Sequence, residues 1–253
     1  MEYSFNEADR RYGVLVGLAA GDKNGGPTQI ALTLWSSLKA CKGYCEDHVK
    51  EMYITWWKKD GWDCGPTFDA VMTEVENGMT WRQAVDTVHN RVNGLTTGCN
   101  PTHRSFPIAL STIPTRELID IARKEAAITH KADISGLSSA FSVLLCRNLI
   151  EGIEWRYALQ RTSDVLSNYQ MQLPIGFKFD RGGHSLSVLA AAIHFIDESP
   201  NFDVCLERAL DFAGPDNYCP VVVGAIGGAR WGASSVPPDH LEHLAPADRH
   251  KLI

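Results

Sequence analysis

Residues 214–232 read GPDNYCPVVVGAIGGARWG, and this stretch decides the fold. A Gly inside a helix costs about 1 kcal/mol relative to Ala, so a helix this rich in small residues is typical of a buried segment against which other backbones pack closely. We predict a central helix that opens at Asp216. The polar pair Asp216-Asn217 has two interpretations: an N-cap of a packing helix, or ligand-binding groups at a helix N-terminus. The small residues are Gly224, Ala225, Gly227, Gly228, Ala229, Gly232 and Ala233.

The totals describe a moderately acidic chain. Its 253 residues are 44% hydrophobic, which is enough for one large core, and we expect a single domain over residues 1–253. A net charge of -6 argues against a nucleic-acid partner. The N-terminal residues lack a signal-peptide pattern, and no apolar run is long enough to cross a membrane. Seven Cys without a CxxC pair indicate reduced thiols, so we expect a cytoplasmic protein that contacts no membrane; its oligomeric state is left open.

Helical periodicity runs through nearly every segment between turns, and no stretch alternates as a strand would. We therefore predict an all-α fold of roughly ten to twelve helices. The segment 133–150 is apolar nearly all round and should be central. Thr80 with Gln83 has the spacing of a capping box, Asn201 is an N-cap, Thr67 and Asp69 can cap the next helix, and His194 should pack in the core. The predicted helices cover 10–20, 28–38, 46–59, 68–76, 80–90, 115–130, 133–150, 154–167, 184–197 and 201–212.

Polar, glycine-rich loops precede several of these helices. They lie at 21–28, 60–67, 93–104, 176–184 and 213–219. If they converge, they form one site rimmed by helix N-termini. Such a site suits a phosphorylated small ligand, because N-terminal N–H groups and the helix dipole favour anions.

Short motifs in these loops and helices recur in one family. The segments are 17–22 (GLAAGD), 27–32 (PTQIAL), 62–67 (WDCGPT), 98–107 (GCNPTHRSFP), 129–130 (TH) and 224–232 (GAIGGARWG). In this order they resemble GxxxGD, the end of (S/T)DDTQxAL, FDxGxT, GNGAAMRxxP, the start of THxHP, and GAxxGAxxG of the ADP-ribosylglycohydrolase family. That family consists of Mg-dependent, all-helical enzymes that remove ADP-ribose from proteins. The resemblance implies a compact orthogonal helix bundle with a cleft for an ADP-ribose-like ligand.

The departures from the family pattern fall on its metal ligands. The family binds two Mg ions through carboxylates and Thr hydroxyls of two motifs. Its paired Asp of the first motif fall here on Gly26 and Pro27, and only Thr28 remains. Its second motif, DxDT, reads Asp216-Asn217-Tyr218-Cys219, one residue closer to Gly224 than usual, so either family Asp can correspond to Asp216. Mg prefers octahedral oxygen ligation with carboxylates. We therefore expect no binuclear Mg centre, at most a single Mg, and no other cofactor.

Two functions remain open. In the first, the protein is a hydrolase that cleaves a ribosyl glycosidic bond in an ADP-ribose-like or nucleotide ligand without a binuclear Mg centre. Such cleavage needs a carboxylate to stabilise an oxocarbenium-like centre or activate water, and often an acid for the leaving group. The candidates are Asp22, Asp63, Asp216 and His184, with His103 and His130 as further acids near neutrality. In the second, the protein is a catalytically inactive ligand-binding or structural relative.

Ligand contacts are expected from the same loops. Each candidate also has a structural alternative: Asp22 and Asp63 can form turns, Arg104 can pair with a carboxylate rather than a phosphate, and His130 can cap helix carbonyls. The resemblance implies that Asp22 and Asp216 face each other across one cleft. The candidate ligand-binding residues are Thr28, Thr97, Gly98, Asn100, His103, Arg104, His130, Gly183 and Asn217.

Overall fold

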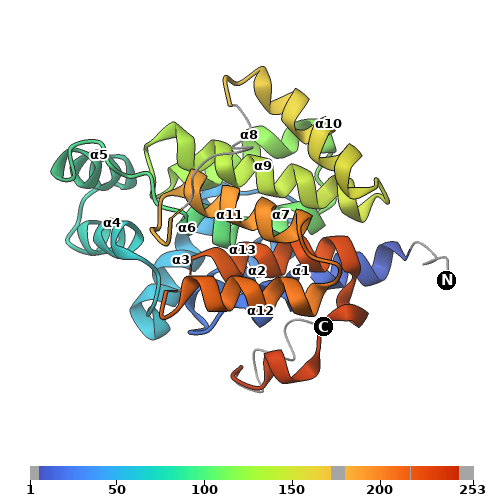
Figure 1. The fold of residues 1–253 in the computed structure, drawn as a ribbon. Helices are drawn as coiled ribbons and strands as arrows, with labels where there is room; N and C mark the ends of the chain where they lie inside the picture. Colours follow the sequence, from blue (N-terminus) through green and yellow to red (C-terminus); the bar gives the residue numbers. More distant parts are fainter. Residues whose placement is uncertain (1–5, 172–179, 217, 245–253) are drawn as a thin grey trace.

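The computed structural model describes residues 6–171, 180–216 and 218–244. Within these ranges the named elements are all helical, which confirms the all-α prediction, and an isolated antiparallel bridge joins Gly98 to His184. The elements, drawn in Figure 1, are α1 (Glu7–Gly21), α2 (Gly26–Cys41), α3 (Glu46–Asp60), α4 (Pro66–Glu76), α5 (Trp81–Arg91), α6 (Asn100–Arg104), α7 (Pro107–Leu110), η1 (Thr115–Glu117), α8 (Leu118–Ala127), α9 (Asp133–Ile150), α10 (Trp155–Ser167), α11 (Ser185–Asp197), α12 (Phe202–Ala213), α13 (Cys219–Trp231), η2 (Ala233–Ser235) and η3 (Pro238–Leu241).

The first and last long helices, α1 and α13, pack backbone against backbone. A Cβ atom added to Gly17 would lie 2.0 Å from the carbonyl oxygen of Gly224, and one added to Gly224 would lie 1.9 Å from that of Gly17. Gly13 and Gly228 make the same reciprocal contact, at 2.2 and 1.9 Å. Only residues without a Cβ permit this approach, so the close packing expected from residues 224–233 is confirmed.

The start of α13 differs from the prediction. The helix begins at Cys219, after Tyr218 as its N-cap, and not at Asp216. Pro220 occupies its first turn, where the missing N–H of proline costs no intrahelical hydrogen bond. No side chain caps this end, so Asp216 does not serve as the N-cap, and Asn217 lies outside the described residues.

Helix α9 runs through the centre of the molecule (Figure 1), with the bounds predicted for it. Every residue from Ser135 to Ile150 is buried, and α6, α8, α10, α11 and α13 all contact it. A helix that is apolar on all sides is stable only with neighbours on all sides. Its position therefore follows from its composition.

The predicted caps hold in part. Thr80 and Gln83 form the capping box, and the Asn201 side chain accepts a hydrogen bond from the N–H of Val204. Helix α4 instead begins at Pro66 after Gly65, whose φ is 78°, and no side chain caps it, so Thr67 and Asp69 do not.

Two further predictions about the helices needed correction. The segment 115–130 splits into η1 and α8. His194 is exposed rather than packed in the core.

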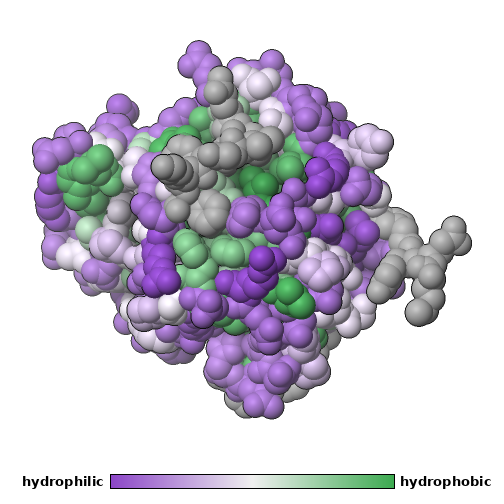
Figure 2. Space-filling view, in the orientation of Figure 1, coloured by the Kyte–Doolittle hydropathy of each residue, from purple (hydrophilic) through white to green (hydrophobic). Residues whose placement is uncertain are grey.

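The surface is largely polar. Figure 2 shows a mainly hydrophilic face on which apolar residues form small separate groups, the usual appearance of a folded protein's exterior. In the described part of the chain, no helix combines the length and apolar character that a membrane crossing requires.

The α1–α13 contact predicts the effect of a single methyl group. Gly224→Ala should lower the free energy of unfolding by about 3 kcal/mol, the upper end of the usual overpacking cost, because the obstructing atom is backbone. Gly136→Ala in α9 is the control, since its Cβ would meet Arg123 at an ordinary 3.4 Å and Ala favours a helix by about 1 kcal/mol. Urea denaturation measures both; equal stabilities would contradict the close approach.

Candidate functional site

The five polar loops converge on one cavity of about 160 Å³. A single water molecule needs only about 10–15 Å³, so the cavity has room for a small ligand. The helices that follow these loops, α2, α4, α6, α11 and α13, begin around it. Convergence of the loops is therefore confirmed for the described residues. The cavity is lined by Pro27, Asp63, Gly65, Pro66, Thr67, Gly98, Cys99, Asn100, His103, His130, Gly183 and Tyr218.

Backbone hydrogen bonds join the loop before α6 to the start of α11. The N–H of Cys99 donates to the carbonyl of Gly183 at 2.9 Å, and the N–H of Ser185 donates to that of Thr97 at 2.9 Å. Thr97 contributes backbone to this junction and is not among the lining residues. His184 is exposed, and its Nδ1 accepts a hydrogen bond from the N–H of Leu186 at 3.3 Å. His184 is thus the N-cap of α11, and the catalytic role expected from the sequence stays a prediction.

Asp22 is fully buried, and its side chain holds together the turn that follows it. Its Oδ1 accepts hydrogen bonds from the backbone N–H groups of Asn24 at 3.1 Å and Gly25 at 2.8 Å. Its Oδ2 accepts from the N–H of Thr28 at 2.8 Å and from the hydroxyl at 2.7 Å. Neither Asp22 nor Thr28 is among the residues that line the cavity. Asp22 and Thr28 therefore build the start of α2, and the catalytic and ligand-binding roles expected for them stay predictions.

Asp216 also lies outside the set of lining residues. Its backbone carbonyl accepts a hydrogen bond from Nζ of Lys23 at 3.1 Å, and the carbonyl of Gly214 accepts another from the same group. The two ends of the chain are therefore adjacent, as the resemblance implied. Their carboxylates do not share the cavity, because that of Asp22 is turned into its own loop.

Asp63 does line the cavity, on a loop that closes over the start of α2. Its backbone is left-handed, with φ 49°, a conformation that Asp tolerates better than most residues. A Cβ added to Gly26 would lie 2.6 Å from the carbonyl oxygens of both Trp62 and Asp63. The loop 62–63 thus occupies the space that a side chain at position 26 would need.

Two neutral histidines face the same cavity. Nε2 of His103 donates to the carbonyl of Tyr218 at 2.9 Å, and burial lowers the pKa of His103 to about 4. Burial, with the nearby charge of Arg104, lowers the pKa of His130 well below its ordinary value. Both rings are therefore uncharged near neutrality, where they can orient a ligand but cannot act as the acids proposed from the sequence. His130 contacts the Thr129 hydroxyl and is not a cap of helix carbonyls.

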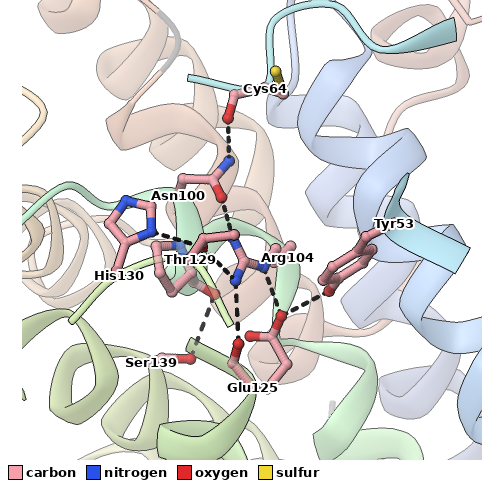
Figure 3. Close-up of polar contacts among 9 residues, drawn as sticks. Tyr53, Cys64, Asn100, Arg104, Glu125, Thr129, His130 and Ser139 are labelled. Atoms are coloured by element: carbon pink, nitrogen blue, oxygen red, sulfur yellow. Dashed lines mark hydrogen bonds and ion pairs between the residues drawn. The ribbon is translucent and has the colours of Figure 1, made fainter. Parts of the chain in front are cut away.

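Arg104 is fully buried, and Figure 3 shows its polar contacts. Its Nε donates to Oε1 of Glu125 at 2.6 Å, and its Nη2 to the Glu125 carbonyl at 3.2 Å and to Oγ1 of Thr129 at 3.0 Å. Its Nη1 donates to Oδ1 of Asn100, whose Nδ2 donates to the carbonyl of Cys64 at 2.9 Å. These contacts agree with the alternative that Arg104 pairs with a carboxylate, and a contact to a ligand phosphate stays a prediction.

The site therefore contains some predicted residues and several that were not predicted. Of the candidates, Asp63, Gly98, Asn100, His103, His130 and Gly183 line the cavity, and Asn217 lies outside the described residues. Glu125 and Thr129, which bind Arg104, were not among the predicted site residues, although Thr129 belongs to the motif at 129–130. A Glu among apolar and small residues of α8, facing the core, was the available signal for the first. Lining residues that were also missed are Pro27, Gly65, Pro66, Thr67, Cys99 and Tyr218.

Comparison with known proteins agrees with this architecture. The family model of ADP-ribosylglycohydrolase matches residues 27–253, so the chain belongs to the ADP-ribosylglycohydrolase family. Among solved structures, 44 chains match. One, described as an ADP-ribosylglycohydrolase-related protein complex, has a TM-score of 0.79 and 20% sequence identity, over 97% of this chain and 95% of that one, and supports the fold alone. No curated protein matches this chain.

The buried histidines predict a loss of stability on acidification. Burial lowers the pKa of His103 to about 4 in the folded protein. Between this value and its ordinary pKa, the ring is protonated in the unfolded chain and neutral in the folded one. Stability is therefore complete above about pH 6.5 and falls below it, by about 2 kcal/mol at pH 5 for this group. His103→Gln should flatten the decline measured by urea denaturation between about pH 7 and pH 5. His243→Gln, at an exposed position, should not, and equal slopes would contradict the assignment.

Asp22 predicts an effect on stability. Asp22→Asn keeps one acceptor oxygen and sets an NH₂ group against N–H or O–H donors, so it should cost about 1–3 kcal/mol. Asp211→Asn is the control, because Asp211 is exposed on α12. Thermal melting of both proteins checks this, and an unchanged melting temperature for Asp22→Asn would contradict the structural role of its hydrogen bonds.

Proposed function

We propose that this protein is a metal-independent hydrolase that cleaves a ribosyl glycosidic bond in an ADP-ribose-like or nucleotide ligand. The observation that carries the proposal is the position of Asp63, the one carboxylate among the described residues that line the cavity. Family membership supports hydrolysis as the reaction class. The cytoplasmic location, the small-molecule ligand and the absence of a nucleic-acid partner stay predictions.

The residues at the family's metal positions do not fit a two-Mg centre. Gly26 and Pro27 carry no ligating group, and the loop 62–63 fills the space beside Gly26. Across the described residues, no three side chains of His, Cys, Asp or Glu come together as a metal cluster would require. We therefore assign no step to a metal.

Asp63 would supply the charge that glycosidic cleavage needs. A carboxylate beside the anomeric carbon stabilises the positive charge that develops there, or activates the attacking water. His103 and His130 are neutral, so they would orient ribose or base atoms rather than protonate them. This arrangement favours a substrate whose leaving group departs without a strong acid.

A second candidate is a ligand-binding protein without turnover. Most glycosidases use a pair of carboxylates, and only Asp63 is found among the described lining residues. The same cavity would then hold its ligand without cleaving it.

Turnover in the presence of a chelator separates these functions. ADP-ribosylated protein and ribonucleotides are incubated with Mg or with EDTA, and product is measured by chromatography. We expect turnover that EDTA leaves unchanged and that Asp63→Asn lowers at least about 100-fold, the lower range of general acid–base effects. Asp60→Asn, at the end of α3, is the control. Binding of ADP-ribose without turnover would support the second candidate, and turnover abolished by EDTA would refute the metal-independent mechanism.

A further inference from the structure

His130 is held between a hydroxyl on one side and a glycine on the other. Its Nδ1 lies 2.8 Å from Oγ1 of Thr129. Its Nε2 faces Gly98, where an added Cβ would lie 3.3 Å away, and both residues line the cavity. In Figure 3 this second nitrogen points away from Thr129. Within the described structure Nε2 has no hydrogen-bond partner, so it is the edge of the ring that a ligand can meet.

The partners of Thr129 determine where the imidazole proton lies. Nη2 of Arg104 donates to Oγ1 of Thr129 at 3.0 Å, and a guanidinium can only donate, so this oxygen accepts. Among the described groups, the remaining neighbour of Oγ1 at hydrogen-bonding distance is Nδ1 of His130. The hydroxyl proton is therefore directed to Nδ1. A neutral ring that accepts at Nδ1 carries its own proton on Nε2.

The opposite arrangement leaves a buried group unsatisfied. If Nδ1 carried the proton and donated to Thr129, the Thr129 hydroxyl would have no acceptor in a fully buried position. Buried polar groups without partners are rare because each loses its hydrogen bond to water without replacement. Arg104 cannot rotate to relieve this, because Glu125 and Asn100 hold its other nitrogens.

The charges around the cavity indicate what this N–H contacts. No Lys or Arg is found among the described lining residues, and Asp63 adds a carboxylate. Among the described residues, a phosphate placed here would meet a negative charge and no cation. The uncharged part of a ligand, a ribose hydroxyl or a base carbonyl, fits the surroundings better.

We propose that Thr129, held by Arg104, is a positioning residue that fixes His130 as the neutral Nε2–H tautomer, and that this N–H is the donor that recognises an uncharged oxygen acceptor of the ligand beside Gly98. The choice of ligand rests on the proposed function, whereas the tautomer does not. His130 thus selects and orients, and the glycine at position 98 leaves space for the acceptor.

The tautomer is measured in the ligand-free protein by long-range ¹H–¹⁵N correlation spectra of the imidazole, assigned with His130→Gln. We expect a protonated Nε2 and an unprotonated Nδ1 that accepts a hydrogen bond, unchanged between about pH 5.5 and pH 8. Thr129→Val should move the Nδ1 resonance toward that of a nitrogen accepting no hydrogen bond, and Thr129→Ser should restore it. Ser142→Ala, which removes a buried hydroxyl from α9, should have no effect. A protonated Nδ1 in the wild type would overturn the tautomer even if Thr129→Val did not fold.

Binding is measured by calorimetry, with ADP-ribose as the probe and ribose 5-phosphate as the comparison. We expect Thr129→Val to weaken ADP-ribose about tenfold, as for one lost hydrogen bond, and Thr129→Ser to stay near wild type. Unchanged affinity in Thr129→Val, or no shift of the His130 signals on adding ADP-ribose, would overturn the recognition role. Neither result depends on turnover, so failure of the hydrolase proposal is seen separately, as binding without product.

Discussion

The structure around the cavity depends on one buried ion pair, Arg104 with Glu125, both fully inaccessible to solvent. Removal of one partner of a buried ion pair typically costs about 3–5 kcal/mol, because the other charge is left inside the protein without compensation. Here the guanidinium contacts Asn100 and Thr129, while the hydroxyl of Tyr53 donates to Oε1 of Glu125 at 2.7 Å. Tyr53 belongs to α3, Asn100 to α6, and Thr129 follows α8. The ion pair therefore fixes the relative position of these three segments.

A second constraint is the close contact of helices α1 and α13. The reciprocal glycine contacts of α1 and α13 bring the ends of the chain together, with a Cβ at Gly21 only 2.0 Å from the carbonyl oxygen of Pro220. The loops that follow α1 and precede α13 must therefore lie side by side, and Lys23 joins them through carbonyls of Gly214 and Asp216. The ion pair of Arg104 holds Asn100, which lines the cavity, and the glycine contact brings together the loops that carry Pro27 and Tyr218. The two constraints are connected, because α13 also packs on α9 and on α6, the helix that carries Arg104.

Most helices could be predicted from the sequence because their signals are local. Apolar periodicity, the Thr80–Gln83 box and the Asn201 cap depend on residues within a few positions, and α9 has the predicted bounds. The converging loops could also be predicted, because each motif stands before a helix. The roles of single polar residues could not be predicted from the sequence. Arg104 pairs with a carboxylate 21 positions away. Asp22 accepts hydrogen bonds from backbone N–H groups of its own turn. A side chain that binds backbone and one that binds ligand look alike in a sequence.

The changes at the family's metal positions follow a consistent electrostatic logic. A cluster of carboxylates is stable at neutral pH only while a cation balances it, since like charges at close range disfavour ionisation. At the positions that correspond by resemblance to the family's paired Asp, Gly26 and Pro27 carry no charge, and the loop 62–63 occupies the space that a side chain at position 26 would need. What remains is a cavity whose described lining has one carboxylate and two neutral imidazoles. Because no Lys or Arg stands in the described lining, the selectivity that we propose comes from oriented uncharged donors, and the hydrogen bonds of Thr129 specify the tautomer of one of them, His130.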